Sequence, residues 1–289
     1  MSNAAPQTVG AAIDAVASRF AAAPLTYGHG TESAWDEAVS LVCHLTTQPD
    51  VQASRARALL PTEWAQIEAL VQQRIEKRIP LAHLLGSASY LGLRFAVEPG
   101  LMIPRSPLGL VLYDEAEDWL PAAPARVLDL CCGTGCLGIV AALMFPAAQV
   151  SLVDLDPRAL TLARRNAASH GVAERCSFRC EDARRLRFDA PFDLVLCNPP
   201  YVNAADMAAL PAEYRAEPEL GLAAGVDGLT IIRPVLAELS SLLTCRGVFM
   251  GEVGRSRPAF EAAPLVPEDR WRIDWIESAE GVFVLRPNT

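Results

Sequence analysis

Short apolar runs alternate with longer helical patterns from Ala125 to the end of the chain. We predict strands at 126–130, 149–153, 176–180, 193–197, 247–253 and 281–285, with helices between them such as 157–169 and 230–243. This alternation predicts a mostly parallel sheet that is covered by helices on both faces. Ligands bind to such sheets at the carboxyl ends of the strands, near the point where the strand order reverses. The residues that directly follow the strands are therefore the first candidates for a functional site.

Length and composition limit the classes of protein to which this chain can belong. With 289 residues, 51% of them hydrophobic, it is long enough for two domains, each with its own core. A net charge of −9 argues against strong binding to nucleic acid and fits a basic protein partner better. The eight cysteines and four histidines have no zinc-binding spacing, so we predict no metal site and expect reduced thiols in the cytoplasm. We recognise no signal peptide and no membrane-spanning run.

The first part of the chain has a different pattern. Apolar residues recur at three- and four-residue spacing, which predicts helices at 9–20, 34–45, 53–60 and 62–77. Thr62 is the expected N-cap of the last of these helices, with Pro61 as a break before it. This small helical domain is either a structural cap or a surface that recognises a macromolecular substrate.

Two apolar runs, 90–97 and 101–105, follow the helical region and are separated by a Pro-Gly turn at 98–100. This arrangement predicts a β-hairpin. We therefore divide the chain into a helical substrate-recognition domain (1–80), a hairpin linker (81–108) and an α/β domain (109–289). Arg105, at the end of the linker, is either a solvated charge or a residue that faces the functional site, if the hairpin folds back.

A glycine-rich loop follows the first predicted strand of the α/β domain. It begins at Asp129 and reads Asp-Leu-Cys-Cys-Gly-Thr-Gly, so Gly133 and Gly135 would let the backbone approach a ligand at the N-terminus of the next helix. With Gly138 these glycines also fit the GxGxxG pattern of dinucleotide-binding proteins. Asp154 ends the second strand, where an acid that accepts both ribose hydroxyls is expected in either case. A nicotinamide-dependent dehydrogenase is therefore an alternative at this point.

Three further observations on aspartates bear on the choice of ligand. Asp129, at the end of the first strand, would repel a pyrophosphate but could pair with the ammonium group of S-adenosylmethionine. Asp182 ends the third strand, where it could accept from an adenine amino group or simply form a turn. Asp156 is the expected N-cap of helix 157–169. The position of Asp129 thus favours S-adenosylmethionine.

Asn198-Pro199-Pro200-Tyr201 follows the fourth predicted strand. The two prolines end the strand and carry no N–H, so this step offers the Asn198 side-chain oxygen and main-chain carbonyls as acceptors with few competing donors. A group that needs two acceptors is a planar NH2, which occurs in nucleobases and in side-chain amides. The simple alternative is a turn with a buried tyrosine.

The glycine loop, the acid after the second strand and Asn-Pro-Pro-Tyr together resemble the class I S-adenosylmethionine-dependent methyltransferases that methylate a planar nitrogen. The similarity is closest to the protein glutamine methyltransferases and rests on Arg78-Ile-Pro-Leu-Ala-His, Ile103-Pro-Arg-Ser-Pro-Leu-Gly, Glu213-Tyr-Arg-Ala-Glu-Pro-Glu-Leu-Gly-Leu and Glu252-Val-Gly. Within this family, Arg105-Ser-Pro resembles the enzymes that modify ribosomal protein L3 rather than those that modify peptide release factors.

This resemblance implies a Rossmann-like domain with a mostly parallel seven-stranded sheet, S-adenosylmethionine as methyl donor and a protein substrate, most closely ribosomal protein L3. Three alternatives stay open: glutamine methylation of release factors, methylation of a DNA or RNA base amino group, and a non-catalytic binding module. The acidic balance of the chain weighs against a nucleic-acid substrate.

The resemblance also implies roles for individual residues. The implied catalytic residues are Asn198, Pro199, Pro200 and Tyr201, with the Asn198 side-chain oxygen and the Pro199 carbonyl accepting the two amide N–H bonds. The implied cofactor-binding residues are Asp129, Cys131, Gly133, Thr134, Gly135, Asp154, Asp182 and Asn198. Arg105 and Glu217 are implied as part of a lid or as support behind the site. The chain departs from the family pattern at Leu110, where a glutamate is usual, and at Cys132, where a threonine is common, so Arg105 lacks a predicted acidic partner.

Overall fold

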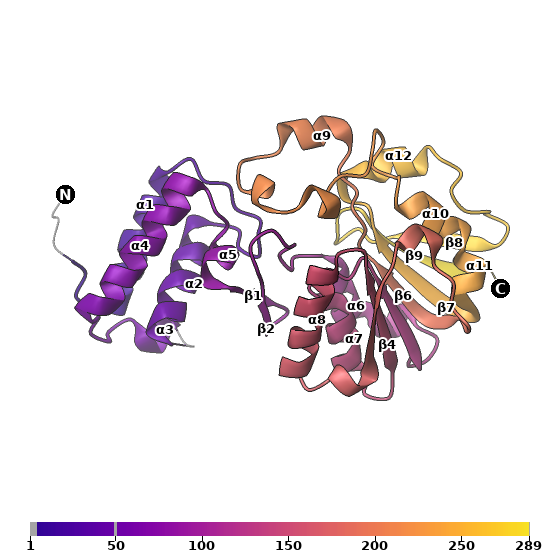
Figure 1. Cartoon of the computed structure of the whole chain (residues 1–289), viewed down its shortest axis with the longest axis horizontal. Coiled ribbons are helices and arrows are strands. Elements are labelled where there is room, and N and C mark those ends of the chain that lie inside the picture. Colours follow the sequence, from indigo (N-terminus) through magenta and orange to yellow (C-terminus); the bar gives the residue numbers. More distant parts are fainter. Residues whose placement is uncertain (1–4, 49–50, 289) are drawn as a thin grey trace.

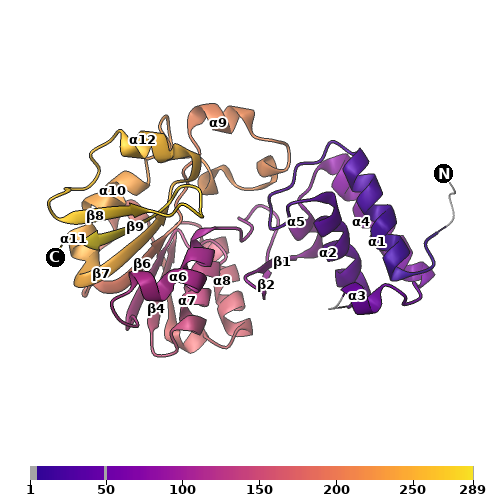
Figure 2. The same cartoon turned by 180° about the vertical axis from the view of Figure 1, so that it is seen from behind.

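Two groups of elements lie next to each other along the long axis of the molecule (Figure 1). The structure is a computed structural model that describes residues 5–48 and 51–288. Helices α1 to α5 gather at one end, and a large sheet with its covering helices forms the other end (Figure 2). The first four residues of the predicted helical domain and the last residue of the chain lie outside the described part. The division into three segments at 80 and 108 stays a prediction.

The helical region consists of α1 (Val9–Ala22), α2 (Ala34–Thr46), α3 (Val51–Ser54), α4 (Pro61–Lys77) and α5 (Leu81–Leu85). The helices predicted near α1, α2 and α4 are therefore confirmed. Their apolar residues, spaced three or four positions apart, face one another and form a core separate from that of the sheet. Ile13, Leu41 and Ile67 are fully buried in it.

Two predictions in the helical region are wrong. The helix predicted at 53–60 is not formed, because α3 ends early and the chain continues toward α4 in a conformation that lets Ala58 form a β-bridge with Thr8. Pro61 is the first residue of α4 rather than a break before it, so Thr62 is not the N-cap. Proline is favoured at this position because the N–H that it lacks would have no partner in the first turn.

A β-hairpin is present, but earlier in the chain than predicted. Strands β1 (Ser87–Tyr90) and β2 (Leu93–Ala96) pair in antiparallel fashion. Leu91 and Gly92 between them both have positive φ, 51° and 74°, as a two-residue type I′ turn requires. The turn predicted at 98–100 is formed, with a hydrogen bond from the Leu101 N–H to the Glu98 carbonyl at 3.1 Å, but it does not join two strands, because the chain that follows it forms no strand.

The large sheet has seven strands in the order β5-β4-β3-β6-β7-β9-β8. The strands are β3 (Arg126–Leu130), β4 (Gln149–Asp154), β5 (Cys176–Cys180), β6 (Phe192–Cys197), β7 (Leu243–Glu252), β8 (Trp271–Trp275) and β9 (Val282–Pro287). The first five strands in this order are parallel, and β9 pairs in antiparallel fashion with both β7 and β8. The predicted α/β fold with a mostly parallel seven-stranded sheet is confirmed, although β8 was not predicted.

Alternate residues of the central strands serve two separate cores. Leu194 and Leu196 of β6 belong to the core under one set of helices, and Val195 and Cys197 belong to the core under the other. The first set is α6 (Leu108–Trp119), α7 (Cys136–Met144) and α8 (Pro157–Ser169), and the second is α10 (Ile232–Ala237), α11 (Leu239–Leu242) and α12 (Arg257–Glu261). The single helix predicted at 230–243 is thus two short helices.

The remaining elements are short. Residues 203–224, which we call the wall segment, contain α9 (Ala204–Ala209) and the 3-10 helices η3 (Tyr214–Ala216) and η4 (Glu219–Gly221). The wall segment lies between the helical region and the sheet (Figure 1). Further 3-10 helices are η1 (Ala173–Arg175), η2 (Ala183–Arg185) and η5 (Gly254–Ser256). In the part of the chain that the structure describes, no helix has the length and apolar character needed to cross a bilayer.

Candidate active site

A cavity of about 890 Å3 lies at the carboxyl ends of β3, β4, β5 and β6, within the usual size range of small-molecule sites. The chain crosses from β5 at the sheet edge to β6 beside β3, so the strand order reverses next to this cavity. The predicted site residues that line it are Arg105, Cys131, Gly133, Thr134, Asp154, Asp182, Asn198, Pro199, Pro200 and Tyr201. Asp129, Gly135 and Glu217 lie behind the wall instead.

The loop after β3 is shaped by left-handed backbone. Cys131, Gly133 and Gly135 have φ values of 57°, 53° and 80°. A Cβ on Gly135 would come within 3.1 Å of side-chain carbon atoms of Ala163 and Leu152, so this glycine allows α7 to pack closely against β4 and α8. Gly135 serves the packing beneath the loop and does not line the cavity, and its contact with a ligand stays a prediction.

Asp154, at the end of the neighbouring strand β4, fixes the loop that follows β3. One carboxylate oxygen accepts from the main-chain N–H of Gly133 at 2.8 Å, and the other accepts from that of Asp156 at 2.9 Å. Each oxygen keeps a second acceptor position. Burial raises the pKa of this carboxyl. Asp156 caps α8 by accepting from the Arg158 N–H, as predicted.

Asp182 lines the cavity but is already bonded. Both of its oxygens accept from the Arg184 guanidinium, and one also accepts from the Arg184 main-chain N–H. The hydrogen bonds from Arg184 lower the pKa of Asp182 to about 2. Of the two roles considered for Asp182, the structure contains the turn, because Asp182 caps the 3-10 helix η2.

Asp129 lies behind the cavity wall. Its side chain is completely buried, and one oxygen accepts from the Gly138 N–H at 2.8 Å. The other oxygen has no hydrogen-bond partner among the described residues. Burial raises the pKa of this carboxyl to about 8, so it is mostly neutral at pH 7. In this position Asp129 holds the start of α7, and its pairing with an ammonium group stays a prediction.

The Asn198 step presents unused acceptors to the cavity. It follows Cys197, the last residue of β6, which pairs with Leu130 of β3 in the centre of the sheet. Within the described part of the chain, no protein group forms a hydrogen bond with the Asn198 side chain or with the Pro199 carbonyl. Two acceptors are thus free for a planar NH2.

Tyr201 is held rigidly at the end of this step. Its hydroxyl donates to Glu252 at 2.9 Å, and its main-chain oxygen accepts from the Ser256 hydroxyl at 2.7 Å. A Cβ on Gly254 would lie only 2.6 Å from the Tyr201 ring, so the ring rests directly on the glycine backbone. Burial, followed by the nearby Glu252 carboxylate, raises the pKa of Tyr201, which keeps its hydroxyl protonated as a donor.

Arg105 has an acidic partner that the sequence did not reveal. Its guanidinium donates two hydrogen bonds to Glu217, one of them at 2.7 Å, and Glu217 also accepts from the Ile103 N–H at 2.9 Å. The Glu217 side chain is completely buried. The alternative of a solvated charge at Arg105 is wrong. Leu110, where a glutamate was expected, is 51% exposed and takes no part in this contact.

Comparison with known proteins decides the family. The model of the methyltransferase small domain matches residues 117–213. The ribosomal protein uL3 glutamine methyltransferase of Bordetella pertussis is 41% identical over 283 residues, which cover 96% of this chain and 95% of that protein. The chain belongs to this family.

A second member, the uL3 glutamine methyltransferase of Burkholderia pseudomallei, is 40% identical over 261 residues and covers 85% of this chain and 84% of that protein. Among solved structures, TrmN from Thermus thermophilus is 25% identical, covers 63% of this chain and 48% of that chain, and has a TM-score of 0.42. Membership of the glutamine methyltransferase family makes this chain an enzyme that transfers methyl groups.

Several residues of this glutamine methyltransferase were not predicted as part of the site. Glu252 is buried and accepts from both Tyr201 and the Ser106 hydroxyl. Ser106 and Glu252 both stand in the motifs that carry the family resemblance, but no spacing rule joins them. His29, from the helical region, lies 3.5 Å from a Glu217 oxygen. The signal for Ser106 and Glu252 was motif membership rather than local pattern, and no motif in the sequence marked His29.

The raised pKa of Asp129 predicts a pH effect on the ligand-free enzyme. In the folded protein the pKa of the Asp129 carboxyl is about 8, which lies above the usual value of 3.8. The folded state therefore holds this proton more tightly, and the stability that it contributes is lost as the pH rises from 3.8 to 8. We expect the melting temperature of the wild type to fall relative to Asp129→Asn across this window, in thermal scans at several pH values.

The matched control for this measurement is Asp156→Asn, because asparagine also caps a helix and this variant keeps Asp129. Its melting curve should follow the wild type at every pH. Parallel curves for the wild type and Asp129→Asn would show that Asp129 is ionised in the folded protein.

Proposed function

We propose that this enzyme transfers a methyl group from S-adenosylmethionine to the side-chain amide nitrogen of a glutamine in ribosomal protein uL3. The observation that carries this proposal is the pair of unused acceptors, the Asn198 side-chain oxygen and the Pro199 carbonyl, on the wall of the cavity. The family membership supports a glutamine amide over a nucleobase as the planar group. A protein substrate also suits a chain with a net charge of −9, since ribosomal proteins are generally basic.

The cavity wall fits S-adenosylmethionine at the ends of β3 and β4. Asp154 keeps two acceptor positions that suit the ribose hydroxyls, and the loop at Gly133 and Thr134 brings main chain to the cavity surface. The cavity is large enough for the cofactor beside a glutamine side chain. When bound, the cofactor supplies an electrophilic methyl group on a sulfonium. Asp129 takes no direct part in this assignment, and Asp182 would contribute only by giving up bonds to Arg184.

Asn198 and Pro199 would compensate for the low nucleophilicity of the amide nitrogen. An amide nitrogen is a poor nucleophile because its lone pair is delocalised into the carbonyl, and its N–H is too weak an acid for a side-chain base at pH 7. Accepting both N–H bonds orients the nitrogen and favours a pyramidal geometry in which the lone pair points away from the two acceptors. One of the two amide protons leaves to water with or after the methyl transfer, so the contribution of the protein is positioning and preorganised electrostatics rather than proton abstraction before it.

The network behind the step keeps these acceptors in place. Glu252 receives hydrogen bonds from Tyr201 and Ser106, and burial raises the pKa of Glu252. Ser106 directly follows Arg105, which Glu217 binds. In this arrangement Tyr201 forms one side of the slot for the amide plane. A location in the cytoplasm, where ribosomal proteins are made, goes with this proposal.

The decisive test is methylation of purified uL3 and of a purified peptide release factor by the same enzyme, with the modified residue located by mass spectrometry. We expect one glutamine of uL3 to gain a methyl group on its side-chain nitrogen, and uL3 to be the much better substrate. S-adenosylhomocysteine should raise the melting temperature, whereas NAD should not. Preferred methylation of the release factor would overturn the choice of substrate, and stabilisation by NAD alone would overturn the methyl donor.

A further inference from the structure

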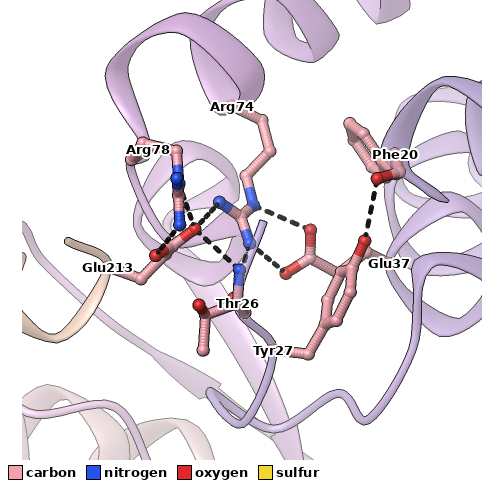
Figure 3. Close-up of polar contacts among 7 residues, drawn as sticks. All are labelled: Phe20, Thr26, Tyr27, Glu37, Arg74, Arg78 and Glu213. Carbon is pink, nitrogen blue, oxygen red and sulfur yellow. Dashed lines mark hydrogen bonds and ion pairs between the residues drawn. The ribbon is translucent and has the colours of Figure 1, made fainter. Parts of the chain in front are cut away.

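Glu213, in the wall segment, is a buried carboxylate with partners in a distant part of the chain (Figure 3). It accepts from the Arg78 guanidinium at 2.6 and 2.7 Å, from the Arg74 guanidinium at 3.1 Å and from the Thr26 main-chain N–H at 2.9 Å. Burial alone would raise its pKa, but the hydrogen bonds led by that from Arg78 lower the pKa of Glu213 to about 2. The carboxylate is therefore charged at neutral pH.

Arg74, at the end of α4, links Glu213 to the interior of the helical region. Its side chain is fully buried, and it donates to Glu37 of α2 at 2.8 and 3.1 Å and to the Thr26 carbonyl at 3.0 Å. Two guanidinium groups thus face two carboxylates, and the cluster is neutral overall (Figure 3). Glu213 is the member that comes from outside the helical region.

Arg78 is held in an unusual backbone conformation at this point. It is the C-cap residue of α4 with φ of 56°, a position at which glycine is favoured because it has no Cβ. Arginine in this left-handed conformation has an unfavourable backbone energy. Its side chain forms an ion pair with Glu213 and is 25% exposed. The contact supplies a physical reason for arginine at a glycine-favouring position.

The residues next to Glu213 reach the cavity. Pro211 and Tyr214 line it, and so does Thr26 from the helical region. The Tyr214 ring lies 4.4 Å from the His29 ring and 5.5 Å from the Arg105 guanidinium, measured to ring centres. A continuous set of contacts therefore runs from the core of the helical region to the cavity wall.

We propose that Glu213 is a positioning residue that fixes the helical region against the cavity wall, so that a protein substrate held by the helices presents its glutamine to Asn198. The inference rests on the proposed function and names the link between substrate recognition and the reacting atoms. Buried ion pairs give little net stability compared with apolar packing, and one established use of them is to select a single arrangement of parts. The Glu213 cluster joins two parts with separate apolar cores.

The test compares two substrates, intact uL3 and a short peptide that contains its methylated glutamine. Arg78→Gly removes the ion pair and relieves the positive φ, so the fold of α4 is retained. We expect its kcat/KM for intact uL3 to fall by roughly 100-fold, the size of effect that misplacement from a remote site produces. Its kcat/KM for the peptide should stay near the wild-type value, because a peptide too short to touch the helices gains nothing from their position.

Two further variants sharpen the comparison. Arg78→Lys keeps a charge near Glu213 and should recover part of the activity on intact uL3, while Glu213→Gln should resemble Arg78→Gly. The control is Glu68→Gln, which breaks the exposed ion pair with Arg19 inside the helical region and should leave both substrates unaffected. An equal loss on uL3 and on the peptide, or no loss on either, would overturn the positioning role.

Hydrogen exchange tests the same contact without any substrate. In Arg78→Gly, the amides of the wall segment and of residues 23–33 should exchange at least about tenfold faster than in the wild type, since charge-assisted hydrogen bonds are lost, while those of β3 and β6 keep their rates. Unchanged exchange in the wall segment would refute the link. If the wild type fails to methylate uL3, the proposed substrate is wrong, and the exchange result still decides whether Glu213 joins the two parts.

Discussion

Asn198→Ala should lower kcat by roughly 10²–10³-fold, the loss seen when one preorganised polar group is removed from a reacting centre. The variant removes one of the two acceptors that orient the glutamine nitrogen. The side chain has no protein partner in the described part of the chain, so the fold should keep its stability. Thermal stabilisation by S-adenosylhomocysteine should change much less than turnover.

Asn198→Asp is the informative companion, because a carboxylate oxygen also accepts an N–H. It should retain more activity than Asn198→Ala. Asn288→Ala, at an exposed asparagine near the end of the chain, serves as the control and should behave as the wild type. If Asn198→Ala turned over uL3 at the wild-type rate, the acceptor mechanism would be untenable.

Glu217→Ala should lower the free energy of unfolding by about 3 kcal/mol, because removing one member of a buried ion pair leaves its partner charge uncompensated. Arg105 loses its bidentate acceptor and the Ile103 N–H loses its partner. Both residues line the cavity, so kcat/KM for the protein substrate should fall as well. Denaturant titration measures the first effect and methylation kinetics the second.

The ion pair of Glu217 also predicts how the stability of the wild type changes with pH. Burial alone would raise the pKa of Glu217, but the Arg105 charge lowers it to about 2 from the usual 4.5. A depressed folded pKa gives stability that is present above 4.5 and is lost as the pH falls toward 2. The wild type should therefore lose stability more steeply than Glu217→Gln in this range. Glu261→Gln, which breaks an exposed pair with Arg257, is the control and should shift the unfolding free energy by less than about 0.5 kcal/mol.

The sheet was predictable because its central strands are buried on both faces and therefore appear as continuous apolar runs. Strand β8 lies at the edge of the sheet, where Arg272 and Asp274 alternate with apolar residues, so it has no such run. The hairpin was misplaced because two candidate turns lie close together. The choice of Leu91-Gly92 over 98–100 depends on the chain after the second turn, which packs along the cavity.

The site was predictable where a residue directly follows a strand. Asp154 and Asn198 are at the cavity because the ends of parallel strands meet at one edge of the sheet. The depth of Asp129 was not predictable, since it depends on how closely α7 packs over it. The partners Glu217 of Arg105 and Glu213 of Arg78 are 112 and 135 positions away, and no local pattern encodes such contacts.

The central position of β6 in the sheet also predicts which parts of the molecule unfold first and which unfold last. Asn198 extends from a strand with parallel neighbours on both sides, β3 and β7, whereas the wall segment contains only α9 and two 3-10 helices. Segments with few regular hydrogen bonds open at lower free energy than central strands. On warming, the enzyme should therefore lose the enclosure around its substrate first and the amide acceptors last. Inactivation would then be a partial and reversible event that precedes global unfolding.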